Sequence, residues 1–197
     1  APGPEPYRHT NPPGSWPYAV PDADLGSTLK LVARATNSTG TPVVNVDRES
    51  AVTAVVQAAP VNLAAVQNGL PALTGTAVRA SGGVSNVLTA SSGLWTGFST
   101  QGAKPITITH LWQRCPATGS LDNCVPVNAD PPVSVPLSPT NPVTCTSAAP
   151  CGGTSQYALS DADLGSRLRV VVTASNSLGS VTLTTPVSAV VVGAPVL

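Results

Sequence analysis

Charged residues are scarce in this sequence. Only 9% of the 197 residues are Asp, Glu, Lys or Arg, and nine basic residues balance nine acidic ones, so the formal net charge is zero. A surface that neutralises nucleic-acid phosphates or anionic lipid headgroups needs a cluster of basic side chains. We therefore expect no nucleic-acid partner.

Methionine is absent, and no apolar run reaches the roughly eighteen residues that a membrane helix needs. The run of small apolar residues at 187–192 is bounded by Pro186 and Gly193. We therefore expect no membrane span. A chain that starts at Ala1 and lacks methionine is typical of a mature protein after removal of a signal peptide, so we expect an extracellular or cell-surface location.

Histidine is nearly absent too, which limits nucleophilic and general-base catalysis. His9 lies in a proline-rich segment, whereas His110 shares a predicted strand face with Trp112, so we interpret His110 as a packed side chain. We predict that the protein is not an enzyme and binds no cofactor.

Carboxylates recur as two matched pairs, Asp22 with Asp24 and Asp161 with Asp163. Such pairs could serve as calcium ligands or glycosidase acids. Because each pair is followed by Leu-Gly, and because the whole motif is duplicated, we interpret these aspartates as turn-forming residues that bind backbone amides. We predict no metal site.

Four cysteines form two close pairs along the chain, Cys115 with Cys124 and Cys145 with Cys151. Three pairings are possible, and we favour the local one. The spacings differ from the CxxC pattern of zinc sites. Each local disulfide would stabilise the fold by about 2 to 3 kcal/mol and would require an oxidising compartment.

One segment of the sequence occurs twice. Tyr18–Thr41 returns as Tyr157–Ser180, and both copies contain Tyr-Ala, Asp-Ala-Asp-Leu-Gly-Ser and Asn-Ser-x-Gly in the same register. The first copy carries four extra residues, which we place around 45–50. Residues 60–156 read as the front half of the same module before the second copy, and the first copy has no such half. We expect the chain to begin in mid-module.

Both copies have the period of a half-buried strand. In the second copy, apolar side chains alternate with polar ones over 166–176. In the first copy, Leu29, Leu31, Ala33 and Ala35 fall on one face, and an Asn-Ser-Thr-Gly turn follows. Apolar stripes at helical spacing are nearly absent. The sequence therefore predicts an antiparallel β-sandwich of about seven strands over 60–193.

Several motifs resemble the bacterial immunoglobulin-like repeats of large surface and secreted proteins. They are Gly93-Leu-Trp95-Thr-Gly97, Trp112-Gln-Arg-Cys115 with Cys124, Tyr157-Ala-Leu159, Asp163-Leu-Gly165, the strand 168–174 and Asn176 through Gly179. The resemblance implies an all-β fold: an immunoglobulin-like antiparallel β-sandwich, with one complete module and an incomplete N-terminal half-module. The expected organisation is a proline-rich arm at 1–17, the partial module at 18–58, the complete module at 60–193 with a disulfide-stapled loop at 116–155, and a tail at 194–197.

An isolated half-module would leave its apolar face wet, so we predict that another polypeptide covers it. Our first hypothesis is a structural subunit of an extracellular filament or surface appendage. Copies of the chain would polymerise head to tail by strand complementation, with Leu29, Leu31, Ala33 and Ala35 as the assembly face.

The alternative hypothesis is a fragment of a multi-repeat surface adhesin or stalk that binds carbohydrate or a host protein. Loop 116–155 and the aromatic residues Trp16, Trp95, Trp112 and Phe98 would then form the binding surface, although core packing is the preferred interpretation of these aromatics. Asn37, in an Asn-Ser-Thr pattern at the predicted turn, is a candidate glycosylation site, although the pattern also suits a plain turn.

Overall fold

The computed structural model describes residues 17–36, 45–79, 86–101, 105–127 and 144–194, and these contain no α-helix. Single 3-10 turns occur at η1 (Asp22–Asp24), η2 (Leu121–Asn123) and η3 (Asp161–Asp163). The remaining elements are strands: β1 (Val32–Thr36), β2 (Asn45–Glu49), β3 (Ala58–Asn62), β4 (Ala72–Thr74), β5 (Val78–Arg79), β6 (Val87–Ser91), β7 (Trp95–Phe98), β8 (Thr107–Cys115), β9 (Val125–Pro126), β10 (Thr154–Ala158), β11 (Arg167–Asn176), β12 (Gly179–Thr184) and β13 (Val192–Gly193).

Two sheets form a β-sandwich over 58–194. One has the strand order β12-β11-β8-β9 and the other β10-β6-β4, and the short pairs β3-β7 and β13-β5 complete the layers. All pairings are antiparallel except β13 with β5. The expected all-β, antiparallel sandwich is therefore confirmed for this part of the chain.

The strand β11 lies at the centre of the larger sheet, between β12 and β8. Its inward side chains Leu168, Val170, Val172 and Ala174 are fully buried, in the alternation that the sequence predicts. On β8, His110 and Trp112 face the same core, and His110 is only 1% exposed. The interpretation of His110 as a packed residue is therefore confirmed.

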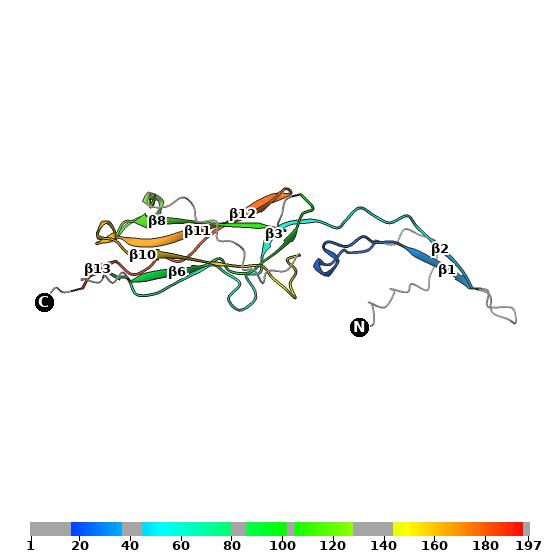
Figure 1. Cartoon of the computed structure of the whole chain (residues 1–197), viewed down its shortest axis with the longest axis horizontal. Helices are drawn as coiled ribbons and strands as arrows, with labels where there is room; N and C mark the ends of the chain where they lie inside the picture. Colours follow the sequence, from blue (N-terminus) through cyan, green and yellow to red (C-terminus); the bar gives the residue numbers. More distant parts are fainter. Residues whose placement is uncertain (1–16, 37–44, 80–85, 102–104, 128–143, 195–197) are drawn as a thin grey trace.

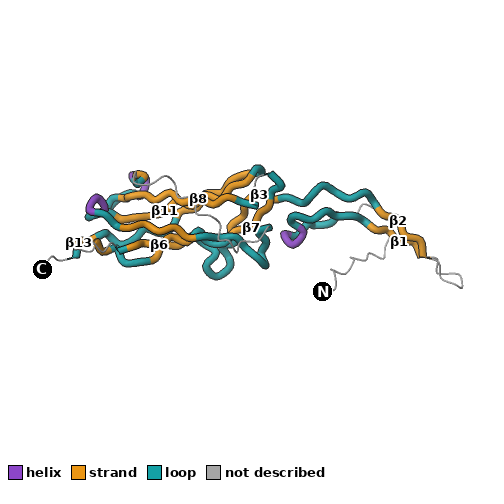
Figure 2. The backbone as a smooth tube through the Cα atoms, in the orientation of Figure 1, coloured by secondary structure: helices purple, strands orange, loops and turns teal. Residues whose placement is uncertain are grey.

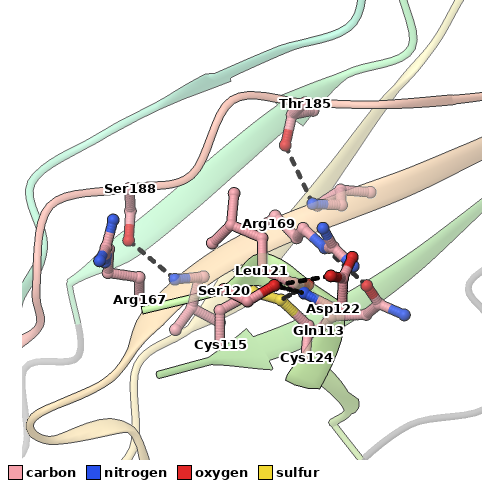
Figure 3. The surroundings of a disulfide bond; sticks show 12 residues. Gln113, Cys115, Ser120, Leu121, Asp122, Cys124, Arg167, Arg169, Thr185 and Ser188 are labelled. Carbon is pink, nitrogen blue, oxygen red and sulfur yellow. Dashed lines mark hydrogen bonds between the residues drawn. A yellow bond between two sulfur atoms is a disulfide. The ribbon is translucent and has the colours of Figure 1, made fainter. Parts of the chain in front are cut away.

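Both disulfides have the local pairing. Cys115–Cys124 closes the end of β8 around η2, and Figure 3 shows its surroundings. Cys145–Cys151 staples a loop onto β7, because the backbone of Cys145 bonds Gly97 and that of Cys151 bonds Trp95. The described ends of the expected loop 116–155 thus belong to the sandwich.

The molecule is elongated (Figure 1, Figure 2). The described chain ends near β13 at one end of the sandwich, and a two-stranded β-ribbon projects from the other end. This ribbon consists of residues 26–36 and 45–56, and it contains β1 and β2. The incomplete first module therefore stands apart from the sandwich core.

Candidate assembly surface

The ribbon repeats the β11–β12 hairpin of the sandwich bond for bond. In the ribbon, the amide of Gly26 donates to Val56 O at 3.0 Å and that of Val56 to Ser27 O at 2.8 Å. The matched amides of Gly165 and Val191 donate to Val191 O and Ser166 O at 2.9 and 2.8 Å. The duplicated sequence therefore folds to the same hairpin in both places.

Hydroxyl side chains complete this ladder at the same positions in both copies. The amides of Leu29 and Leu31 donate to the side-chain oxygens of Thr53 and Ser50, each at 2.9 Å. In the sandwich, Ser188 and Thr185 accept in the same way from the amides of Leu168 and Val170, and Figure 3 shows both hydroxyls directed at β11. Along this part of each hairpin, the second strand advances three residues for every two residues of the first. Some amides of the first strand therefore have no backbone carbonyl opposite them, and the hydroxyls accept from these amides.

The sequence interpretation missed this device, although a signal for it exists. The spacing Ser50-x-x-Thr53-x-x-Val56 returns as Thr185-x-x-Ser188-x-x-Val191. A period of three differs from the period of two of a regular strand, so a search for alternation does not detect it.

Burial is where the two hairpins differ. Val170 and Val172 are fully buried in the sandwich, whereas the matched Leu31 is 64% exposed and Ala33 is also exposed. Among the described residues, β1 pairs with β2 alone, so its other edge meets no strand. The predicted assembly face of Leu29, Leu31, Ala33 and Ala35 is thus presented on an open two-stranded sheet.

The register corrects one detail of the repeat. Thr36 pairs with Asn45 in the ribbon, and Ser175 pairs with Ser180 in the sandwich. The four extra residues of the first copy therefore lie within 37–44, between the strands, and not around 45–50. The candidate glycosylation site Asn37 also falls there, outside the described residues.

Exposed ion pairs link the two strands of the ribbon on one face. Lys30 lies 2.9 Å from Glu49, and Arg34 lies 2.6 Å from Asp47. These exposed pairs occupy the face opposite Leu29 and Leu31, so the ribbon has one charged face and one largely apolar face. Arg48 is the exception on the apolar side, because it lies opposite Ala33.

A turn in which a tyrosine hydroxyl donates to an aspartate precedes each hairpin, and we call it the tyrosine–aspartate corner. In the sandwich, the fully buried carboxylate of Asp163 accepts from Tyr157 Oη at 3.0 Å, from the Ser160 amide at 2.7 Å and from Arg114 Nη2 at 2.5 Å. Burial raises the pKa of Asp163, but the hydrogen bonds from Ser160 and Arg114 outweigh it and hold this pKa below its usual value. Asp163 thus binds a backbone amide at its own turn, as interpreted for the aspartates of the repeat.

In the first copy the same corner has fewer partners. Tyr18 Oη donates to Asp24 at 2.8 Å, as Tyr157 does to Asp163. Pro21 replaces Ser160 and supplies neither an amide nor a hydroxyl donor. Among the described residues, no basic side chain pairs with Asp24 as Arg114 pairs with Asp163.

The base of the ribbon contacts the loop stapled by Cys145–Cys151. The Ser147 amide donates to Asp22 Oδ2 at 2.5 Å, and hydrogen bonds from the side chain and the amide of Ser147 lower the pKa of Asp22. Gly26 lies so close to Thr144 that an added Cβ would come within 2.7 Å of its methyl group, and the φ of Gly26 is +81°. The loop closed by the second disulfide therefore contacts the chain where the ribbon begins.

Two of the aromatic residues proposed for carbohydrate stacking, Trp95 and Trp112, are buried and cannot belong to an exposed platform. Trp95 is fully buried and donates to Ser92 O at 2.8 Å, and Trp112 donates to Ser155 and stacks on Tyr157 with ring centroids 5.3 Å apart. Trp16 lies outside the described residues. Trp95 and Trp112 are core residues, as preferred.

The described parts of the chain bring together no group of three His, Cys, Asp or Glu side chains suited to a metal ion. They also contain no helix that could span a bilayer. Comparison with protein-family models, with curated proteins and with solved structures found no match.

Proposed function

We propose that this chain is a structural subunit of an extracellular filament or surface appendage, built from sandwich modules that complete one another by strand complementation. One observation carries the proposal. The ribbon has the ladder of β11–β12, but its apolar face is exposed at Leu31 where the sandwich buries Val170 completely. Covering a Leu-sized side chain stabilises by about 1.5 to 3 kcal/mol, so a completing partner is favoured.

The number of hairpins limits what the partner is. The described residues of each copy contain two hairpins of this type, the ribbon and β11–β12, but one front half, β3 to β10, which β11–β12 already occupies. Completion in the manner of the sandwich therefore requires the front half of a further module. Two disulfides support an oxidising environment for such an assembly.

The test compares the isolated chain with the native assembly. Electron microscopy and intact mass of native material should find elongated particles, and hydrogen exchange at the amides of β1 should be slow in the assembly and fast in the isolated chain. Filaments formed by the purified chain alone would show that copies of the chain complete one another and that the front half of a further module is not required. Fast exchange of β1 in the native assembly would contradict the proposal.

A matched pair of substitutions separates the two faces of the ribbon. Leu31→Gln changes the apolar face and should abolish slow exchange of β1 in the assembly. Val32→Gln, on the neighbouring residue and the opposite face, should leave it in place. Equal effects of both substitutions would argue against assembly through the apolar face.

A further inference from the structure

The open edge of β1 has a counterpart in the sandwich that shows what kind of strand it accepts. There, β11 pairs antiparallel with β8, and the inward residues of the two strands lie opposite one another. Ala174 lies opposite Ile108, Val172 opposite His110, Val170 opposite Trp112 and Leu168 opposite Arg114. The β8 strand thus presents three packing side chains followed by one cation.

The cation, Arg114, forms an ion pair at the end of this strand. Arg114 reaches past Leu168 to the carboxylate of Asp163, with its Nε at 2.9 Å and its Nη2 at 2.5 Å. The carboxylate is completely buried and the guanidinium is partly exposed, so Arg114 neutralises a charge that the core cannot solvate. The contact between β8 and the β11–β12 hairpin therefore includes a charge-assisted hydrogen bond.

The corner before the ribbon keeps the aspartate, but no basic residue of the described ranges pairs with it. Asp24 retains the bond from Tyr18, but Pro21 removes the two donors that Ser160 supplies, and no described basic residue pairs with Asp24. A strand that covered Leu29 and Leu31 would also take water away from Asp24. Such a strand is stable only if it brings a cation to this position.

We propose that the ribbon binds, along the open edge of β1, an antiparallel strand from the front half of a further module, and that this strand carries a basic residue opposite Leu29 that pairs with Asp24. The inference rests on the proposed function and names its partner. The strand has the pattern of β8: packing residues opposite Ala35, Ala33 and Leu31, then the base. Charge complementarity with Asp24 fixes the register, because a shift by one residue would turn the base away from the apolar face.

The probe is a synthetic peptide of residues 105–115 with Cys115→Ser, added to the full chain. Hydrogen exchange should slow at Val32–Thr36 and stay unchanged at β11, which is already paired. An Arg114→Gln peptide should bind at least roughly tenfold more weakly, the loss expected for a hydrogen bond to a charged group. Asp24→Asn in the chain should cause a similar loss and should make the two peptides equivalent. Asp22→Asn, whose carboxylate faces Ser147, is the matched control and should leave the preference for the arginine peptide intact.

Two outcomes would overturn the inference without touching the proposed function. Equal binding of both peptides would contradict the ion pair, and no binding of either peptide would contradict the β8-like strand, while slow exchange of β1 in native assemblies would still support complementation. Fast exchange of β1 in those assemblies would instead contradict the proposed function itself.

Discussion

The guanidinium of Arg114 lies 2.5 Å from the carboxylate of Asp163, which has no solvent-exposed surface. Arg114 comes from β8 in the front half of the module, and Asp163 comes from the corner before β11 in the back half. The pair thus joins the two halves that the duplicated sequence separates. In the part of the chain that the structure describes, the matched Asp24 has no such ion pair.

Removing this base should destabilise the sandwich. Arg114→Gln leaves the buried Asp163 with Tyr157 and Ser160 alone, and we expect the free energy of unfolding to fall by about 2 to 3 kcal/mol in urea titrations. Arg34→Gln is the control, because the Arg34–Asp47 pair is exposed and should leave the midpoint unchanged. Equal effects of the two substitutions would contradict the importance of burial at Asp163.

Stability should also depend on pH through His110. Burial lowers the pKa of this imidazole below its usual 6.5, and neither ring nitrogen has a hydrogen-bond partner among the residues that the structure describes. The unfolded chain therefore takes up a proton first as the pH falls below about 6.5, and the free energy of unfolding should decrease from there downward. His110→Leu should flatten the dependence just below pH 6.5.

A second acid-sensitive range belongs to Asp163. The folded-state pKa of this carboxyl lies below its usual 3.8, so its stabilising effect is present above that pH and is lost as the pH falls through the folded-state pKa. In His110→Leu, stability measured by thermal unfolding should stay level to about pH 4 and decline below it. A flat profile down to pH 2 would contradict the ion pair.

The hydroxyl device should be measurable at Thr185, which is 5% exposed. Thr185→Val keeps the shape but leaves the Val170 amide without its acceptor, so we expect a loss of about 1 to 3 kcal/mol. Thr185→Ser retains the oxygen and should cost less. Thr184→Val, on the neighbouring exposed residue, should have little effect on the urea midpoint.

The two disulfides should differ in their effect on the ribbon. Replacing Cys145 and Cys151 by serine removes a short staple worth about 2 kcal/mol, and it should also speed exchange of the Ser147 amide that bonds Asp22. Replacing Cys115 and Cys124, at the far end of the sandwich, should destabilise the fold and leave that amide protected. Loss of Ser147 protection in both variants would show that the staple has no local role.

Much of the fold could be predicted from two features of the sequence, the alternation of apolar and polar residues and the duplicated segment. The period of two over 166–176 predicted which side chains of β11 are buried, because a pleated strand sends successive residues to opposite faces. The repeat of Tyr18–Asp24 as Tyr157–Asp163 predicted matching corners. The hydroxyls of Ser50 and Thr53, spaced three residues apart, were missed. They accept from backbone amides that lack a carbonyl partner, and these amides can be identified only when the pairing of the two strands is known.

By itself, the sequence determined that the chain is all-β, that its back-half hairpin occurs twice, and which four residues of the first copy share one face of a strand. Local spacing suffices for these, since each depends on neighbours within one strand or one corner. Only the tertiary structure decided that Arg114 reaches Asp163 across 49 residues, that Trp95 is buried, and that the ribbon rests on the loop of Cys145–Cys151 with its edge open. Those contacts join segments that are distant in the sequence, and long-range packing produces no periodic pattern in the sequence from which it could be predicted.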